Sequence, residues 1–198
     1  MNELPMYGGQ HDPSVEANPK FSTDAAKRGW KAYYEGDFDT AIKRFNQAWM
    51  FNRNNPEVYW GFGLVMGQRS SEEEPEKNLK ESIRLLEIGR KLDGENGRML
   101  GDLALSHTLL GSFLKSKKLD AGANFHKASE LFKEAYRLDP GYPPTVANWA
   151  VYFLYTRDYL PAQEKANQAM EMGYDFTRDF LKDLELLKRY HERRHGKK

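Results

Sequence analysis

The sequence contains no cysteine. Disulfide bonds, thiolate metal sites and a cysteine nucleophile are therefore excluded, although a chain without thiols can work in an oxidising or a reducing compartment. No apolar run approaches the roughly 20 residues that a helix needs to cross a bilayer, so we expect no transmembrane segment. No signal peptide is visible, because Met1 leads directly into the polar stretch NELPMYGGQHDP.

An excess of charge of either sign is also missing. Thirty Lys and Arg residues against 29 Asp and Glu residues give a formal net charge of +1. That balance offers no global argument for binding to nucleic acid or membranes, and we expect no nucleic-acid partner. The 198 residues are 39% hydrophobic and 13% aromatic. This is enough for one globular domain with a substantial core.

What the chain does have is an internal repeat. In each of four segments a small residue is followed four positions later by a larger or apolar residue, and three positions after that by another small one. The spacing of four and three places each triplet on one helical face, where the small residues let a neighbouring helix come close. The triplets are Ala41, Phe45, Ala48; Ser82, Leu86, Gly89; Ala128, Phe132, Ala135; and Ala162, Ala166, Ala169.

The triplets begin at positions 41, 82, 128 and 162, which gives intervals of 41, 46 and 34 residues. The last interval equals the period of the tetratricopeptide repeat (TPR), and the others exceed it by 7 and 12. We assign the extra residues to two polar stretches, 68–78 and 112–126, which we expect to be loops between the two helices of a repeat.

A second set of helices precedes the triplets. We expect these first helices over about 24–35, 56–68, 97–111 and 143–156, with Pro56 and Pro143 at first helical positions, where a missing N–H costs least. Small residues recur in them at the point where paired helices should cross. These are Gly29, Gly63, Ala104 and Ala150.

These patterns resemble the TPR family over about residues 22–174. The resemblance implies an all-α, TPR-type solenoid of about four helix-turn-helix repeats, at about 22–55, 56–96, 97–142 and 143–174. Residues 1–21 are expected to be an extended segment, and residues 175–198 a C-terminal capping helix with a basic tail. Arg53 and Gly94 stand where the family has a repeat-ending proline, a departure that affects helix boundaries more than the fold. The alternative is an unrelated helical bundle with alanines on its inner faces.

A closer likeness concerns location. The stretches PMYGG, GWKAYYEGDFDTAIKRFNQAW and NNPEVYWGFG look like those of a group of small bacterial TPR proteins, whose precursors commonly carry an export or lipoprotein signal. The likeness implies a periplasmic or envelope-associated protein, and a cytoplasmic location is the alternative.

The resemblance also implies a function. TPR stacks bind a peptide or helix of a partner in a concave groove lined by the first helices, and neither catalysis nor a cofactor is expected. Positions 2, 5, 9 and 12 of each first helix face this groove in the family. Here they include Ala26, Trp30, Tyr33, Glu57, Trp60, Leu64, Arg98, Leu105, Thr108, Ala147, Val151 and Leu154.

This lining is mostly apolar and aromatic, which suits an apolar peptide anchored by Trp and Tyr. Chaperone-binding TPR domains instead grip a carboxylate with Lys and Asn at positions 5 and 9, and this chain has neither there. Two alternatives stay open. The aromatic residues could pack between repeats, or the extended N-terminal segment, through Leu4, Met6 and Tyr7, could fill the groove.

The tail raises a competing hypothesis, because HERRH at residues 191–195 matches the H-E-x-x-H pattern of zinc peptidases. On a helix, His191 and His195 would share one face and could chelate a metal. We expect no catalytic zinc, since no third ligand follows His195 and Arg193 and Arg194 would repel a dication. The six basic residues near this end most simply favour a helix C-terminus.

The sequence therefore predicts a non-catalytic TPR scaffold that binds a protein or peptide partner. Two alternatives remain: a structural subunit that self-associates into a homo-oligomer through an exposed repeat face, and a zinc-dependent hydrolase that uses HERRH.

Overall fold

The structure is a computed structural model, and it describes residues 16–71 and 73–195. Within these ranges every regular element is an α-helix, and none is long and apolar enough to cross a membrane. The chain divides into two compact units that meet in sequence between Glu95 and Asn96. We describe each unit by itself.

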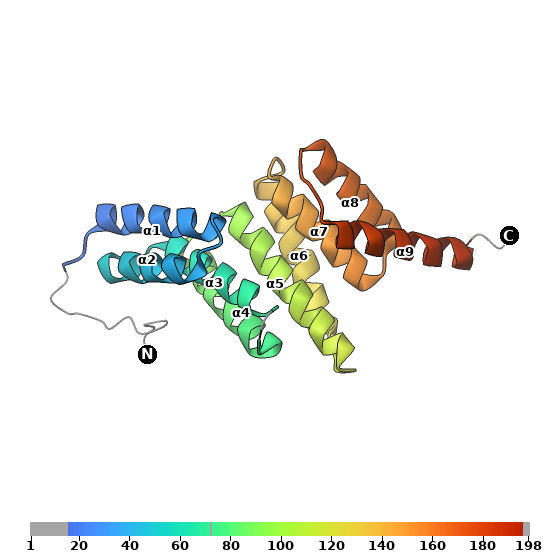
Figure 1. The fold of residues 1–198 in the computed structure, drawn as a ribbon, viewed down its shortest axis with the longest axis horizontal. Helices are drawn as coiled ribbons and strands as arrows, with labels where there is room; N and C mark the ends of the chain where they lie inside the picture. The colour runs from blue at the N-terminus through green and yellow to red at the C-terminus, as the bar shows by residue number, and fades with distance from the viewer. Residues whose placement is uncertain (1–15, 72, 196–198) are drawn as a thin grey trace. The chain divides into compact units, whose positions relative to one another are not determined.

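The first unit consists of two helix pairs, α1–α2 and α3–α4 (Figure 1). Within each pair the helices lie side by side, and α3 also packs on α1 and α2. The helices are α1 (Pro19–Tyr34), α2 (Phe38–Phe51), α3 (Pro56–Arg69) and α4 (Pro75–Leu92).

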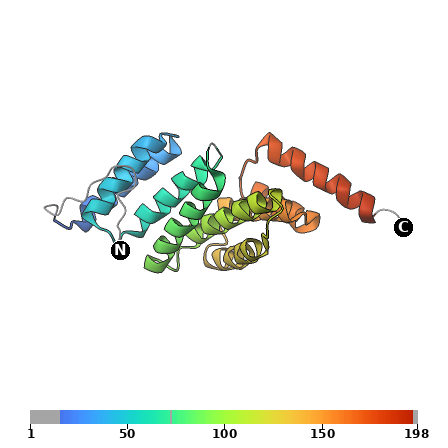
Figure 2. The ribbon, with the colours of Figure 1, turned by 90° about the horizontal axis from the view of Figure 1, so that it is seen from below.

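The second unit repeats this plan with α5–α6 and α7–α8 and then adds a final helix. The C-terminal part of that helix projects beyond the other helices of its unit (Figure 2). The helices are α5 (Gly97–Ser116), α6 (Gly122–Leu138), α7 (Pro143–Thr156), α8 (Tyr159–Glu171) and α9 (Arg178–His195). The predicted fold class, all-α helix pairs closed by a C-terminal helix, is confirmed.

Several predicted boundaries were wrong, including those of the stretch 68–78, where α3 continues to Arg69 and α4 starts at Pro75. The first helix begins at Pro19, five residues before the expected start at Asp24, because the Asn18 side chain accepts a hydrogen bond from the Phe21 N–H and proline occupies the first turn. The stretch 112–126 is mostly helix, since α5 continues to Ser116 and α6 starts at Gly122. Most of the extra length in this repeat therefore lengthens helices, where it can bury apolar side chains.

The predicted triplets form the contact faces of the second helices. All twelve residues are buried, including the three alanines of α8, and the larger member of the first and third triplets, Phe45 and Phe132, is fully enclosed. The small residues expected at helix crossings, Gly29, Gly63, Ala104 and Ala150, are buried as well. Spacing alone thus identified the residues that allow close helix packing.

In the first unit, one aromatic ring is held between two glycines. A Cβ atom added to Gly29 of α1 would lie 2.7 Å from the Phe45 ring of α2, and one added to Gly61 of α3 would overlap the same ring. No real side chain makes such contacts, so only glycine fits at these positions. As a result α1 and α3 can approach Phe45 from two sides.

A buried polar network joins the first three helices. The Ser22 hydroxyl of α1 donates to the Ala48 carbonyl of α2 at 2.8 Å, and accepts from the Asn55 side-chain amide at 2.9 Å. The Asn55 side-chain oxygen accepts from the Glu57 N–H at 3.1 Å and so caps α3. This network fixes where α3 begins relative to α1 and α2.

Helix α9 covers the end of the second unit, as predicted. Its Phe180, Leu184 and Leu187 are buried in one apolar cluster with Ala150 of α7 and Ala162 of α8. Phe176, which precedes the helix, stacks on Phe180 with ring centroids 4.1 Å apart. The last pair of the array therefore has its apolar face covered.

Candidate functional site

Four of the residues predicted for the groove come together in the first unit. Trp30 and Tyr33 on α1 and Trp60 on α3 are half-buried, and the Trp30 ring lies 4.8 Å from Trp60 and 5.9 Å from Tyr33, both edge-on. Glu57, one turn before Trp60, is also half-buried. We call Trp30, Tyr33, Tyr34, Glu57 and Trp60 the aromatic site.

The glycine contacts around Phe45 explain why these rings meet. Trp30 directly follows Gly29, and Trp60 directly precedes Gly61, so the close approach at the glycines brings the two indoles together. The Trp30 ring also packs edge-on against Phe45, with centroids 5.3 Å apart. One edge of the site is thus part of the core, while the rest lies at the surface.

The carboxylate of Glu57 is oriented by a tryptophan. The Trp30 indole N–H donates to Glu57 Oε2 at 2.5 Å, which connects α1 with α3. Burial raises the pKa of Glu57 above its ordinary value; the Trp30 hydrogen bond lowers it and the negative charge of Asp93 raises it further. The aromatic site therefore contains a desolvated carboxyl group whose hydrogen-bond donor is a tryptophan.

Sequence reasoning missed Tyr34. This residue is 73% exposed and stacks on Trp30, with centroids 6.0 Å apart and the ring planes 26° from parallel. The groove positions of the TPR family include Tyr33 but not the next residue, Tyr34. The i to i+4 spacing from Trp30 could have revealed it, because residues four apart share a helical face.

The remaining predicted groove residues behave differently. Ala26, Thr108 and Ala147 are buried, so the side chains of these three residues do not lie at a surface. Short side chains at these positions serve helix packing. Arg98 is exposed and contacts residues of its own unit, since it pairs with Asp139 at 2.8 Å and lies 4.5 Å above the Tyr142 ring. The half-buried members are Leu64, Leu105, Val151 and Leu154.

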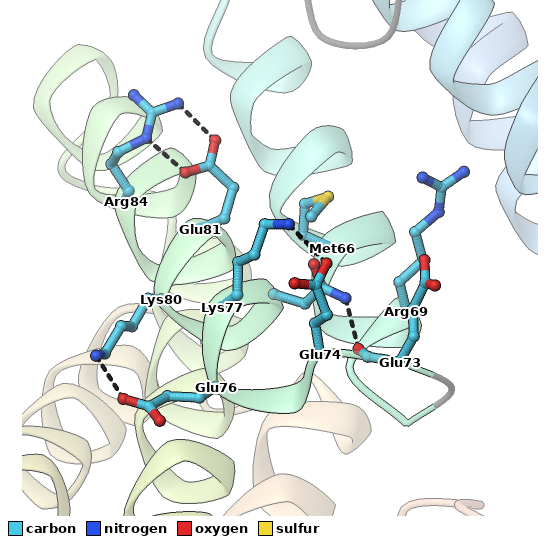
Figure 3. Close-up of a pocket in the computed structure, with 10 residues that line it drawn as sticks. Met66, Arg69, Glu73, Glu74, Glu76, Lys77, Lys80, Glu81 and Arg84 are labelled. Carbon is cyan, nitrogen blue, oxygen red and sulfur yellow. Dashed lines mark hydrogen bonds and ion pairs between the residues drawn. The ribbon is translucent and has the colours of Figure 1, made fainter.

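A hollow of about 860 Å³ lies between α3 and α4 of the first unit (Figure 3). Its lining holds four basic and four acidic side chains, and most of them pair with one another. Lys77 contacts Glu74 and Lys80 contacts Glu76, each at 2.6 Å, while Arg84 contacts Glu81 at 2.7 Å. With its charges balanced and paired, this hollow selects no class of ligand.

A smaller groove of about 360 Å³ runs between α7 and α9. Leu154, Tyr155, Leu186 and Tyr190 form its apolar walls, so one predicted groove residue, Leu154, does line a depression. The outer side of α9 adds a shallow hollow with Leu181 and Leu186 among charged residues.

The HERRH stretch forms the last turns of α9. His191 and His195 share one face, as predicted, with ring centroids 4.6 Å apart, and His191 also contacts the Tyr159 ring at 5.3 Å. Within residues 16–71 and 73–195, no three His, Asp or Glu side chains group closely enough to hold a metal ion. The described chain thus offers two imidazoles without the third protein ligand that zinc catalysis uses.

Comparison with known proteins adds little to this geometry. No protein-family model matches the chain, and no curated protein matches it. Among solved structures, the chain is similar to pilF of Pseudomonas aeruginosa, with 14% sequence identity and a TM-score of 0.37. That similarity covers 90% of this chain and 94% of the other.

The architecture within each unit is that of a TPR-like helical repeat. Consecutive helix pairs bury small residues at 4-and-3 spacing on the second helix and a small residue at the crossing point of the first. Partner-binding surfaces of such repeats lie on helix faces rather than in closed pockets. The aromatic site has this form, since it is built on α1 and α3, the first helices of two successive pairs.

Proposed function

We propose that this protein is a non-catalytic scaffold that binds a segment of a partner protein through the aromatic site. The observation that carries the proposal is the grouping of Trp30, Tyr34 and Trp60 at the surface of two successive first helices, next to the Glu57 carboxylate. Tryptophan and tyrosine supply large contact areas at low entropic cost and dominate many protein interfaces. The proposal includes a location in the bacterial cell envelope, which the likeness to small bacterial TPR proteins implies.

The experiment is a capture of partners from the source organism followed by measurement of affinity. Purified wild-type protein is compared with Tyr34→Ala and with Trp60→Ala, after thermal melts show that each variant is folded. Tyr34 is the better probe, because its exposed ring can be removed without opening the core. A matched control is Tyr155→Ala, which removes a partly exposed tyrosine from α7 in the other unit.

We expect the captured partner to bind Tyr34→Ala and Trp60→Ala about tenfold more weakly than it binds wild type, because each variant removes a large side chain that anchors the interface. The partner should bind Tyr155→Ala with the same affinity as wild type. Equal affinity for all four proteins would refute the aromatic site as the binding surface.

Self-association is the second candidate, and the exposed side chains of α9 favour it. Leu181 and Leu186 are 42% and 61% exposed on that helix. However, the same hollow is lined by three basic residues, Arg178, Lys182 and Arg189, against one acidic residue, Glu185, and this excess of positive charge would oppose the packing of two copies. Light scattering over a concentration series should therefore report a monomer.

A further inference from the structure

We infer that the aromatic site accepts a cationic side chain, lysine or arginine, from the bound partner. This inference rests on the proposed function and names the chemistry of the group that is recognised. It starts from the one charged member of the aromatic site, Glu57.

The Glu57 carboxylate accepts a side-chain hydrogen bond from a neutral group, the Trp30 indole, and not from a cation. Among residues 16–71 and 73–195 no basic side chain forms an ion pair with it. Asp93 adds a second negative charge that acts on it. A half-buried anion held by one neutral donor lacks the compensation that buried charges normally require. A cation supplied by a partner would provide it.

The rings around the carboxylate suit the same ligand. Tyr33, Tyr34 and Trp60 all lie within 6.0 Å of the Trp30 centroid, so electron-rich surfaces gather beside the acid. Ammonium and guanidinium groups are attracted to tryptophan and tyrosine faces, and their aliphatic stems cover apolar surface. Lysine and arginine therefore satisfy the carboxylate and the rings together.

Other ligand classes fit less well. A phosphate or an acidic peptide would meet the Glu57 carboxylate and no basic member of the site, so it would be repelled. A purely apolar side chain would desolvate Glu57 further without neutralising it. Lys31, which directly follows Trp30 in the sequence, pairs with Glu35 at 3.8 Å.

The test uses the full chain labelled with ¹⁵N and follows its four tryptophan indole N–H signals by NMR. The probes are N-acetyl-arginine methylamide and its neutral isostere N-acetyl-citrulline methylamide. We expect the arginine probe to shift the Trp30 and Trp60 signals and to leave Trp49 and Trp149 in place. The citrulline probe should shift none of the four. Glu57→Gln should weaken the response to arginine by about threefold to tenfold, in line with the loss of one charge partner beside aromatic rings.

Equal responses to both probes, or an unchanged response in Glu57→Gln, would overturn cation recognition. The captured partner separates this failure from failure of the proposed function. If the partner bound Glu57→Gln normally but no longer bound Tyr34→Ala, recognition of a cationic group would be refuted. The aromatic site would still be the surface that binds the partner. Normal binding to both variants would refute the binding surface itself.

Discussion

Two glycines determine how closely α1 and α3 approach the Phe45 ring. Replacing Gly61 by alanine places a methyl group inside that ring, and overpacking of this kind costs about 1–3 kcal/mol. The better helix propensity of alanine offsets about 1 kcal/mol of this cost. We therefore expect Gly61→Ala to lower the free energy of unfolding by up to about 2 kcal/mol in urea titrations.

Gly67→Ala is the matched control in the same helix. A Cβ there would lie 3.5 Å from the Ser82 hydroxyl, which is an ordinary contact. This variant should be as stable as wild type or more stable by up to about 1 kcal/mol. If Gly61→Ala proved as stable as Gly67→Ala, the close packing around Phe45 would be wrong.

Glu57 makes a second prediction at the residue scale. The pKa of Glu57 is higher in the folded protein than the ordinary 4.5, so ionisation of Glu57 destabilises the fold. This loss of stability is absent at pH values below the unfolded-state pKa. It is complete at pH values above the folded-state pKa. Glu57→Gln should therefore be more stable than wild type at pH 7, by less than about 1 kcal/mol because solvent screens a half-buried group.

This gain should disappear as the pH is lowered through the carboxyl range, because wild-type Glu57 then becomes protonated too. Thermal melts of wild type and Glu57→Gln at pH values from 3 to 7, in steps of roughly one unit, measure the difference in stability between the two proteins. Glu95→Gln removes the same charge from an exposed position and serves as the control. A stability gain that persisted in acid would contradict the desolvation of Glu57.

At the scale of helices, the polar network around Ser22 holds α1, α2 and α3 in register. Ser22→Ala would leave the Ala48 carbonyl and the Asn55 amide without this partner in a buried place. Such a loss costs about 1–3 kcal/mol, and chemical denaturation should show it. Thr23→Ala is the control, because its exposed hydroxyl bonds only to the Pro19 carbonyl of its own helix. Similar effects for the two variants would argue against the network.

The contribution of α9 can be measured in the same way. Leu184 is buried against α7 and α8, whereas Leu186 is 61% exposed on the same helix. Leu184→Ala should destabilise the protein by about 2–4 kcal/mol, because it removes buried apolar contacts and leaves a cavity. Leu186→Ala should change stability by less than about 0.5 kcal/mol. Equal melting temperatures for both variants would mean that α9 does not cover the end of its unit.

At the scale of the whole molecule, the zinc hypothesis can be tested directly. Two histidines four apart can chelate a transition metal weakly, but the described residues supply no third ligand to His191 and His195. We expect metal analysis of the purified full chain to find much less than one zinc per molecule, and EDTA to leave its melting temperature unchanged. One tightly held zinc together with chelator-sensitive peptidase activity would overturn the non-catalytic function.

Local sequence patterns predicted most of the helices and the faces on which they pack, although some boundaries differed. Periodicity is local, so the spacing of Ala41, Phe45 and Ala48 was enough to predict a buried face, and Pro56 was enough to start α3 at the observed residue. The same local patterns predicted the final helix, whose Leu184 and Leu187 are buried.

Which of the predicted groove residues lie at the surface depends on how the helices pack. Family positions could not distinguish Trp30 from Ala147, because exposure depends on neighbouring helices far away in sequence. The pairing of Trp30 with Glu57 likewise follows from the approach of α1 and α3 across a span of 27 residues. Side-chain burial and carboxylate desolvation are properties of packed helices, and no local pattern in the chain encodes them.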